Sequence, residues 1–204
     1  SGIIKGKLFP SNKDSLTFAG MIDFSDINYN DVFLADQTEG NIEVLMAESP
    51  EYVLDLNLSA PVISSVRLQD LGFQTNGEIS EGRTSGDFQL IFSSSTEEGQ
   101  IVHSGTYRTT EDSASIRTTY FELASSLRTL NLKNPFTIDI DMARQSARID
   151  TMRLESKDGA ALELAATYVD SVNQQGHLSG QDLHLTAVQT LLLGEADVKS
   201  ILPG

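Results

Sequence analysis

Apolar and polar residues alternate along several stretches of this chain. Residues 136–142 (Phe-Thr-Ile-Asp-Ile-Asp-Met) put four apolar side chains on one side and three polar ones on the other. The same alternation occurs in residues 52–58, 88–92 and 162–168, and less regularly in residues 16–22 and 42–46. Because successive side chains of a β-strand point to opposite sides of a sheet, this period predicts strands with one apolar and one polar face.

Turn-forming residues separate these stretches. Asn76-Gly77 and Asp158-Gly159 are predicted two-residue hairpin turns, because both residue types tolerate positive φ. Further turn signals fall at residues 11–14, 38–41, 97–99 and 173–176. Short links of this kind join antiparallel neighbours, whereas parallel strands need long crossovers. The sequence therefore predicts an all-β fold built as an antiparallel meander.

One short helix is expected near the C-terminus. Thr186 and Gln189 have the spacing of a capping box, in which each side chain bonds the backbone N–H of the other residue. The leucines at 191–193 follow, and Gly194 closes the segment. We expect this helix over Thr186–Leu193.

Length and charge narrow the class of protein. The chain has 204 residues, 29 acidic and 14 basic side chains, and a net charge of -15. Such a balance argues against binding nucleic acid, which needs clustered Lys and Arg, and against electrostatic docking on anionic lipid heads. Cysteine is absent, so disulfides and thiolate metal sites are excluded.

The chain opens Ser1-Gly2 and ends Leu202-Pro203-Gly204, and we expect it to be one β segment (residues 1–204) of something larger, with a module break near residues 105–125.

Paired carboxylates are the first candidate for chemistry. Asp139 and Asp141 share the polar side of one predicted strand, about 7 Å apart at ~3.4 Å per residue, a separation that a glycosidase could use. Acids on the solvent side of a strand are ordinarily just hydrated, and the chain contains no Trp for a sugar platform. We therefore predict no catalytic residue and no enzyme activity.

Metal ligands are equally sparse. His103, His177 and His184 lack a zinc-binding spacing, and each is expected either to face solvent or to lie on a strand surface. An oxygen-rich stretch with Asp23, Asp26, Asn28, Asn30 and Asp31 could hold calcium, but it lacks the EF-hand order, and Asx-rich stretches usually form turns. Nucleotide-binding and nucleophile motifs are absent, so no metal and no cofactor are predicted.

The order of the predicted elements resembles a known repeat. It runs through Gly105-Thr106-Tyr107, Tyr120–Leu123, Leu130–Leu132, an Asn-Pro-Phe entry to residues 135–142, Ile149–Ser156, Leu162–Leu164, Leu178–Leu185 and the short helix. This order is similar to the β module of the AsmA-like family that includes TamB, the inner-membrane-anchored part of the translocation and assembly module. The resemblance covers residues 48–193 more closely than the first 47, and it departs from the usual Gly-x-Leu at His103–Tyr107.

Membership of that family would imply a periplasmic bridge. Its β modules stack into an elongated curved sheet, a half-pipe or β-taco with an apolar groove. The parent proteins are anchored in the inner membrane, carry phospholipid toward the outer membrane, and help outer-membrane proteins assemble together with a barrel partner. The resemblance thus implies acyl chains and an outer-membrane barrel as partners.

Residues that would face lipid are the apolar members of the alternating strands. They are Leu54, Leu56, Phe88, Leu90, Phe92, Phe136, Ile138, Ile140, Leu162, Leu164, Leu183 and Leu185. The same pattern would arise in the sealed core of a closed β-sandwich, such as a carbohydrate- or protein-binding adhesion module. From the sequence both interpretations stay open.

Overall fold

The computed structural model describes residues 2–12, 15–29, 33–63, 66–67, 69–93, 99–125, 128–169 and 173–182. The described residues form fifteen strands in one sheet. The strands are β1 (Gly2–Asn12), β2 (Ser15–Tyr29), β3 (Phe33–Met46), β4 (Glu51–Ser59), β5 (Val62–Ile63), β6 (Val66–Arg67), β7 (Asp70–Ser80), β8 (Arg83–Ser93), β9 (Gly99–Thr109), β10 (Ser113–Ser125), β11 (Thr129–Leu132), β12 (Phe136–Asp141), β13 (Ser146–Glu155), β14 (Ala161–Tyr168) and β15 (Gln174–Gln181).

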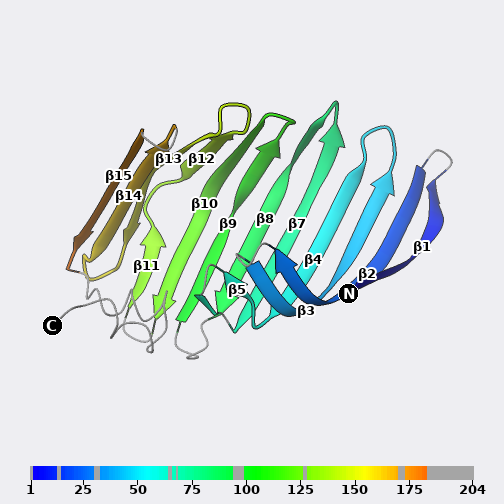
Figure 1. Cartoon of the computed structure of the whole chain (residues 1–204), viewed down its shortest axis with the longest axis horizontal. Helices are drawn as coiled ribbons and strands as arrows, with labels where there is room; N and C mark the ends of the chain where they lie inside the picture. Colours follow the sequence, from blue (N-terminus) through cyan, green and yellow to red (C-terminus); the bar gives the residue numbers. More distant parts are fainter. Residues whose placement is uncertain are drawn as a thin grey trace.

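Antiparallel pairing between chain neighbours builds nearly the whole sheet. The order is β1-β2-β3-β4-β7-β8-β9-β10-β11-β13-β14-β15 (Figure 1). Like β11, the short strand β12 pairs with both β10 and β13. The short strand β5 pairs with the start of β3 and with β6. The predicted all-β antiparallel meander is confirmed. The helix expected over Thr186–Leu193 lies outside the described residues.

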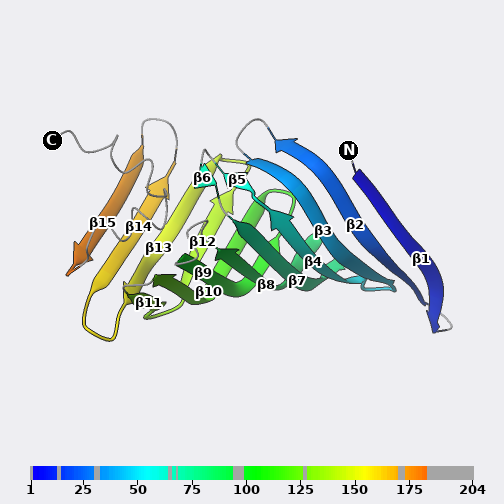
Figure 2. The ribbon, with the colours of Figure 1, turned by 90° about the horizontal axis from the view of Figure 1, so that it is seen from below.

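The sheet is both twisted and bent. Strands at its two ends lean in opposite directions, as the right-handed twist of each strand requires (Figure 2). In that view the outer strands spread away from the central strands β7–β10, with β13–β15 on the left and β1–β3 on the right. Pairing continues through residues 105–125, where β9 and β10 run together with one register shift between Thr118 and Tyr120.

The two predicted two-residue hairpin turns, at Asn76-Gly77 and Asp158-Gly159, have different outcomes in the structure. Asp158-Gly159 does lie in the hairpin connection between β13 and β14, and Gly159 has φ +92°. The connection spans the five residues 156–160 and Asp158 does not have positive φ, so the predicted two-residue turn is wrong in its length. Asn76-Gly77 lies inside β7 instead, so that prediction is wrong. The chain reverses at Glu81 and Gly82, with φ of 46° and 73°. Asn76 and Gly77 stay extended because β4 and β8 pair with β7 on both sides.

Candidate functional site

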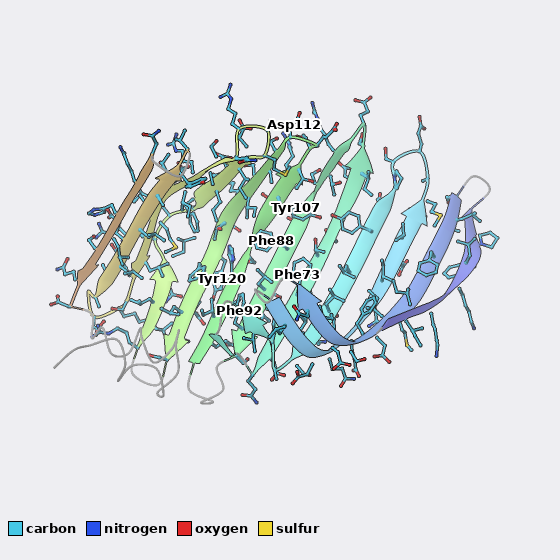
Figure 3. All side chains as sticks on the ribbon, viewed as in Figure 1. Phe73, Phe88, Phe92, Tyr107, Asp112 and Tyr120 are labelled. Atoms are coloured by element: carbon cyan, nitrogen blue, oxygen red, sulfur yellow. The ribbon has the colours of Figure 1, made fainter. Side chains whose placement is uncertain are left out.

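One face of the sheet, here called the apolar face, collects the apolar half of the alternating pattern. Residues directly opposite each other in antiparallel strands point the same way, so the register identifies the face. One such row runs Leu56, Phe73, Leu90, His103 and Phe121 across five strands. Figure 3, which shows the molecule in the view of Figure 1, labels Phe73, Phe88 and Phe92 within this region.

Ten of the twelve side chains predicted to face lipid lie on the apolar face, and the other two, Leu183 and Leu185, lie outside the described residues. Phe136 is buried. The remaining nine are half-buried, namely Leu54, Leu56, Phe88, Leu90, Phe92, Ile138, Ile140, Leu162 and Leu164. The structure therefore brings the predicted set together on one surface that spans β4 to β14.

One end of the apolar face is covered by the chain itself. Beyond Asp26, where φ is 54°, the β2–β3 hairpin leaves β4 and pairs with β5. In Figure 1 these segments pass in front of the lower ends of β4 and β7. Ala35 is 2% exposed and packs with Leu58 and Leu71, and Ile27 joins this cluster. The hairpin end thus acts as a short second layer at this end of the sheet.

A second buried cluster lies at the junction of β10, β11 and β13. Leu154 is 1% exposed and packs with Leu123 and Leu130. Met152 and Leu162 extend it across β13 and β14 while remaining half-buried. Between the two clusters, the described residues form a single layer on which large apolar side chains keep part of their surface exposed.

His103 sits within the apolar face. Its ring centroid lies 4.9 Å from that of Phe88, edge to face, and 5.4 Å from that of Phe121. Nε2 shares a 2.8 Å hydrogen bond with the hydroxyl of the fully buried Thr118. Burial lowers the pKa of the imidazole, so the neutral ring is favoured. His103 therefore lies on a strand surface, one of the two positions expected for it, but on the apolar face and half-buried, because its strand parity matches that of the surrounding apolar residues.

A hydroxyl-bearing row crosses the apolar face at its uncovered end. Tyr52, Gly77, Gly86 and Tyr107 pair directly across β4, β7, β8 and β9. Thr75 donates a hydrogen bond to the carbonyl oxygen of residue 87 at 2.8 Å and lies 3.2 Å from the Tyr107 hydroxyl. Burial raises the pKa of Tyr52, and its hydrogen bond with Thr75 opposes that rise. Gly77 leaves room for both hydroxyls, since a β-carbon there would lie 2.9 Å from that of Tyr52 and 3.0 Å from that of Tyr107.

The opposite surface, here called the polar face, carries the candidate acids. Asp139 accepts a 2.7 Å hydrogen bond from the Ser115 hydroxyl, and Asp141 accepts one of 2.8 Å from the backbone N–H of Arg144 in the following turn. These contacts give the two carboxylates structural partners. His177 also lies on this face and is exposed, as predicted, whereas His184 lies outside the described residues.

No group of three or more His, Cys, Asp or Glu side chains suited to a metal ion occurs among the described residues. Of the oxygen-rich stretch, Asp23 and Asp26 are exposed on β2, and Asn30 and Asp31 lie outside the described part of the chain. The calcium alternative, which the sequence disfavours, is therefore not tested at this stretch.

No family model, curated protein or solved structure matches this chain. The resemblance to AsmA-like proteins thus stays an expectation from the sequence. Within the described ranges, no helix is long and apolar enough to cross a membrane.

Sequence reasoning overlooked two features of the apolar face. Strand parity alone could have placed His103 there, because Ile101 and Gly105 flank it at the same spacing of two. The Tyr52–Tyr107 row could not be found in this way, because it depends on a cross-strand register that joins residues 55 positions apart.

Proposed function

We propose that this chain is a non-enzymatic segment whose apolar face binds the acyl chains of phospholipids. In this proposal the curved sheet is a half-pipe, or β-taco, within a periplasmic protein anchored in the inner membrane. It carries lipid toward the outer membrane and supports assembly of outer-membrane proteins with a barrel partner. The location and the protein partner rest on the resemblance to AsmA-like proteins.

The observation that carries the proposal is a continuous apolar face on a single sheet. The predicted lipid-facing side chains span β4 to β14, eight strands along the main path of the sheet, and at a spacing of about 4.8 Å this gives an apolar surface on the order of 35 Å long. Phe88, Leu90, Ile138 and Leu164 lie on it half-buried. A closed sandwich would need a second sheet over these side chains, and the described residues form one sheet. We therefore favour lipid over the adhesion-module alternative.

The free energy of transferring an acyl chain from water to the apolar face suits a lipid carrier. Each methylene that leaves water gains about 0.8 kcal/mol, so ten methylenes on the apolar face gain roughly 8 kcal/mol. Because this attraction has no direction and the face continues across neighbouring strands, a chain can slide while keeping most of its contact. Transport of this kind needs no reactive group.

Photocrosslinking tests the proposal directly. A photoreactive amino acid is placed at Ile138 or Leu164 on the apolar face, with matched controls at the adjacent Asp139 and Glu163 on the polar face. The chain is expressed in a Gram-negative periplasm, irradiated and analysed by mass spectrometry. We expect phospholipid adducts at Ile138 and Leu164 in clear excess over the controls. Equal labelling of both faces, or no adduct and no co-purified lipid, would refute lipid binding.

A further inference from the structure

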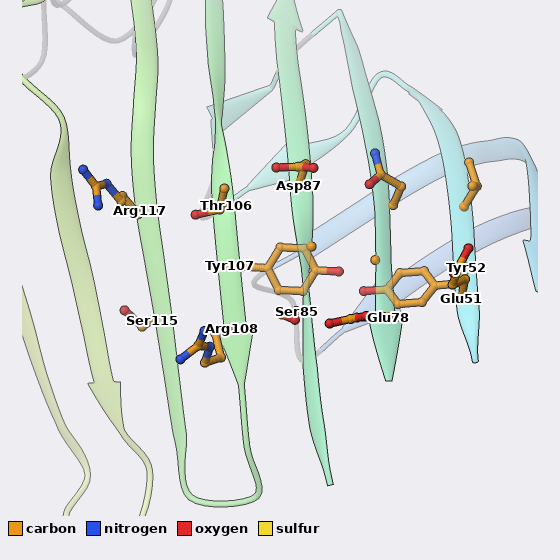
Figure 4. A pocket seen from close by; sticks show the side chains of 14 residues that line it. Glu51, Tyr52, Glu78, Ser85, Asp87, Thr106, Tyr107, Arg108, Ser115 and Arg117 are labelled. Atoms are coloured by element: carbon orange, nitrogen blue, oxygen red, sulfur yellow. The ribbon is translucent and has the colours of Figure 1, made fainter. Parts of the chain in front are cut away.

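The polar face has a hollow of about 670 Å³ over β4 and β7–β10 (Figure 4). Charges of opposite sign occupy its two sides. Arg108 and Arg117 lie over β9 and β10, while Glu78 and Asp87 lie over β7 and β8, with Glu51 on β4 beside Glu78. Four residues of the hydroxyl-bearing row, Tyr52, Gly77, Gly86 and Tyr107, also line the hollow, while its charged side chains belong to the polar face. An inference about these charges does not depend on lipid binding.

Cross-strand register shows how these charges are spaced. Asp87 pairs with Thr106, and Thr106 pairs with Arg117. In the next row on the same face, Ser85 is paired with both Glu78 and Arg108. In each row, an acidic residue, a hydroxyl-bearing residue and an arginine therefore follow one another on three successive strands. At about 4.8 Å per strand, the acidic pair and the arginine pair lie roughly 10 Å apart, centre to centre.

Neither arginine of the hollow takes part in an ion pair among the described residues. Two other arginines of the same face do form ion pairs, Arg148 with Asp150 at 3.0 Å and Arg153 with Glu155 at 2.8 Å. Arg108 and Arg117 are diagonal neighbours, and each also has an acid in a diagonal position, Asp87 for Arg108 and Asp139 for Arg117. Among the described residues neither acid forms an ion pair with these arginines, so both exposed guanidinium groups keep donors available for a bound carboxylate.

We propose that this hollow binds an extended polypeptide segment of a partner protein, one that carries an acidic cluster and, about 10 Å further along, a basic cluster. The acidic cluster lies over Arg108 and Arg117, and the basic cluster lies over Glu78 and Asp87. A purely anionic ligand would meet these acids, whereas a segment with both charges satisfies both sides. Three extended residues span about 10 Å, so two acids and two lysines separated by one residue match the hollow.

Synthetic peptides test this surface without knowledge of the partner. The probe is a fluorescent peptide containing Asp-Asp-Ser-Lys-Lys, and the control is Asp-Lys-Ser-Asp-Lys, which has the same composition. Binding to the 204-residue chain is followed by fluorescence anisotropy, and by amide shifts of Ser85, Thr106 and Arg108. We expect the block peptide to bind roughly tenfold more tightly than the mixed one, and to weaken as salt is raised.

Substitutions of the two arginines test whether the preference for the block peptide arises in the hollow. Arg108→Gln with Arg117→Gln should abolish the preference for the block peptide, while Arg148→Gln, on the same face but ion-paired, should leave it intact. Arg108→Glu with Arg117→Glu should instead favour Lys-Lys-Ser-Lys-Lys, and circular dichroism checks that each variant is folded. Equal affinity for block and mixed peptides, or a preference that survives the double glutamine variant, would overturn the proposal.

Discussion

Replacement of Leu154 by alanine tests how far the apolar face stabilises the fold. Leu154 is 1% exposed and packs with Leu123 and Leu130, where β11 pairs with both β10 and β13. Truncation removes the transfer free energy of the lost methyl groups and leaves a cavity that neighbouring strands fill only in part. For buried leucines the two effects together cost roughly 2.7–5 kcal/mol. A native domain has only about 5–15 kcal/mol of unfolding free energy, so the loss should be a large share of it.

Leu178→Ala is the matched control. Leu178 lies on the same face, directly opposite Leu164, but it is 70% exposed on β15 at the edge of the described sheet. Its truncation should change the free energy of unfolding by less than about 0.5 kcal/mol. Urea unfolding followed by far-UV circular dichroism measures both variants. We expect a lower midpoint for Leu154→Ala with an unchanged m-value, because stability changes and the exposed surface does not.

Two outcomes would refute this reasoning. A loss at Leu178 as large as that at Leu154 would show that β15 is covered in solution by something other than the described strands. A negligible loss at Leu154 would show that the cluster it shares with Leu123 and Leu130 does not hold β10, β11 and β13 together.

Three further predictions concern the middle of the sheet. Gly86→Ala should destabilise the fold by more than about 2 kcal/mol in urea unfolding, because a β-carbon there would lie 1.9 Å from a backbone oxygen of β7. Gly72→Ala is the control and should be nearly neutral, because the atom nearest to a β-carbon at that position is 3.6 Å away. Burial lowers the pKa of His103, so below about pH 6.5 the unfolded chain binds more protons and stability should fall as pH drops through the folded-state pKa; His103→Asn should flatten this part of the pH dependence of the urea midpoint. Tyr107→Phe removes the hydroxyl beside Thr75 and should cost about 0.5–1.5 kcal/mol by the same assay, and an unchanged midpoint would show that this contact contributes nothing to stability.

The sequence was most informative where alternation was strong. Residues 52–58, 88–92, 136–142 and 162–168 lie wholly or mostly in strands β4, β8, β12 and β14, with the expected faces, because period-two patterning and strand geometry are the same constraint. It failed where pairing overrode local preference. Asn76-Gly77 would suit a turn, but β7 is paired along both of its sides there, and the backbone remains extended.

The curl of β2 and β3 over Leu58 and Leu71 could not be predicted either. It depends on contacts between Ala35 and residues 23 and 36 positions further along the chain, and no local pattern reports those. The opposed charges around Arg108 and Arg117 were missed for the same reason. Each acid and its arginine are 30 positions apart, and only the register of three successive hairpins aligns them.

The neighbour-to-neighbour order of the strands has a consequence for how such a chain can change length. Nearly every strand is bonded to strands close to it in sequence, so little entropy is lost in closing long loops, and assembly can spread outward from any hairpin. Insertion or deletion of one hairpin would lengthen or shorten the sheet by about 10 Å and leave its cross-section unchanged. Evolution and protein engineering could therefore adjust the reach of this architecture in hairpin-sized steps, much as in solenoid proteins.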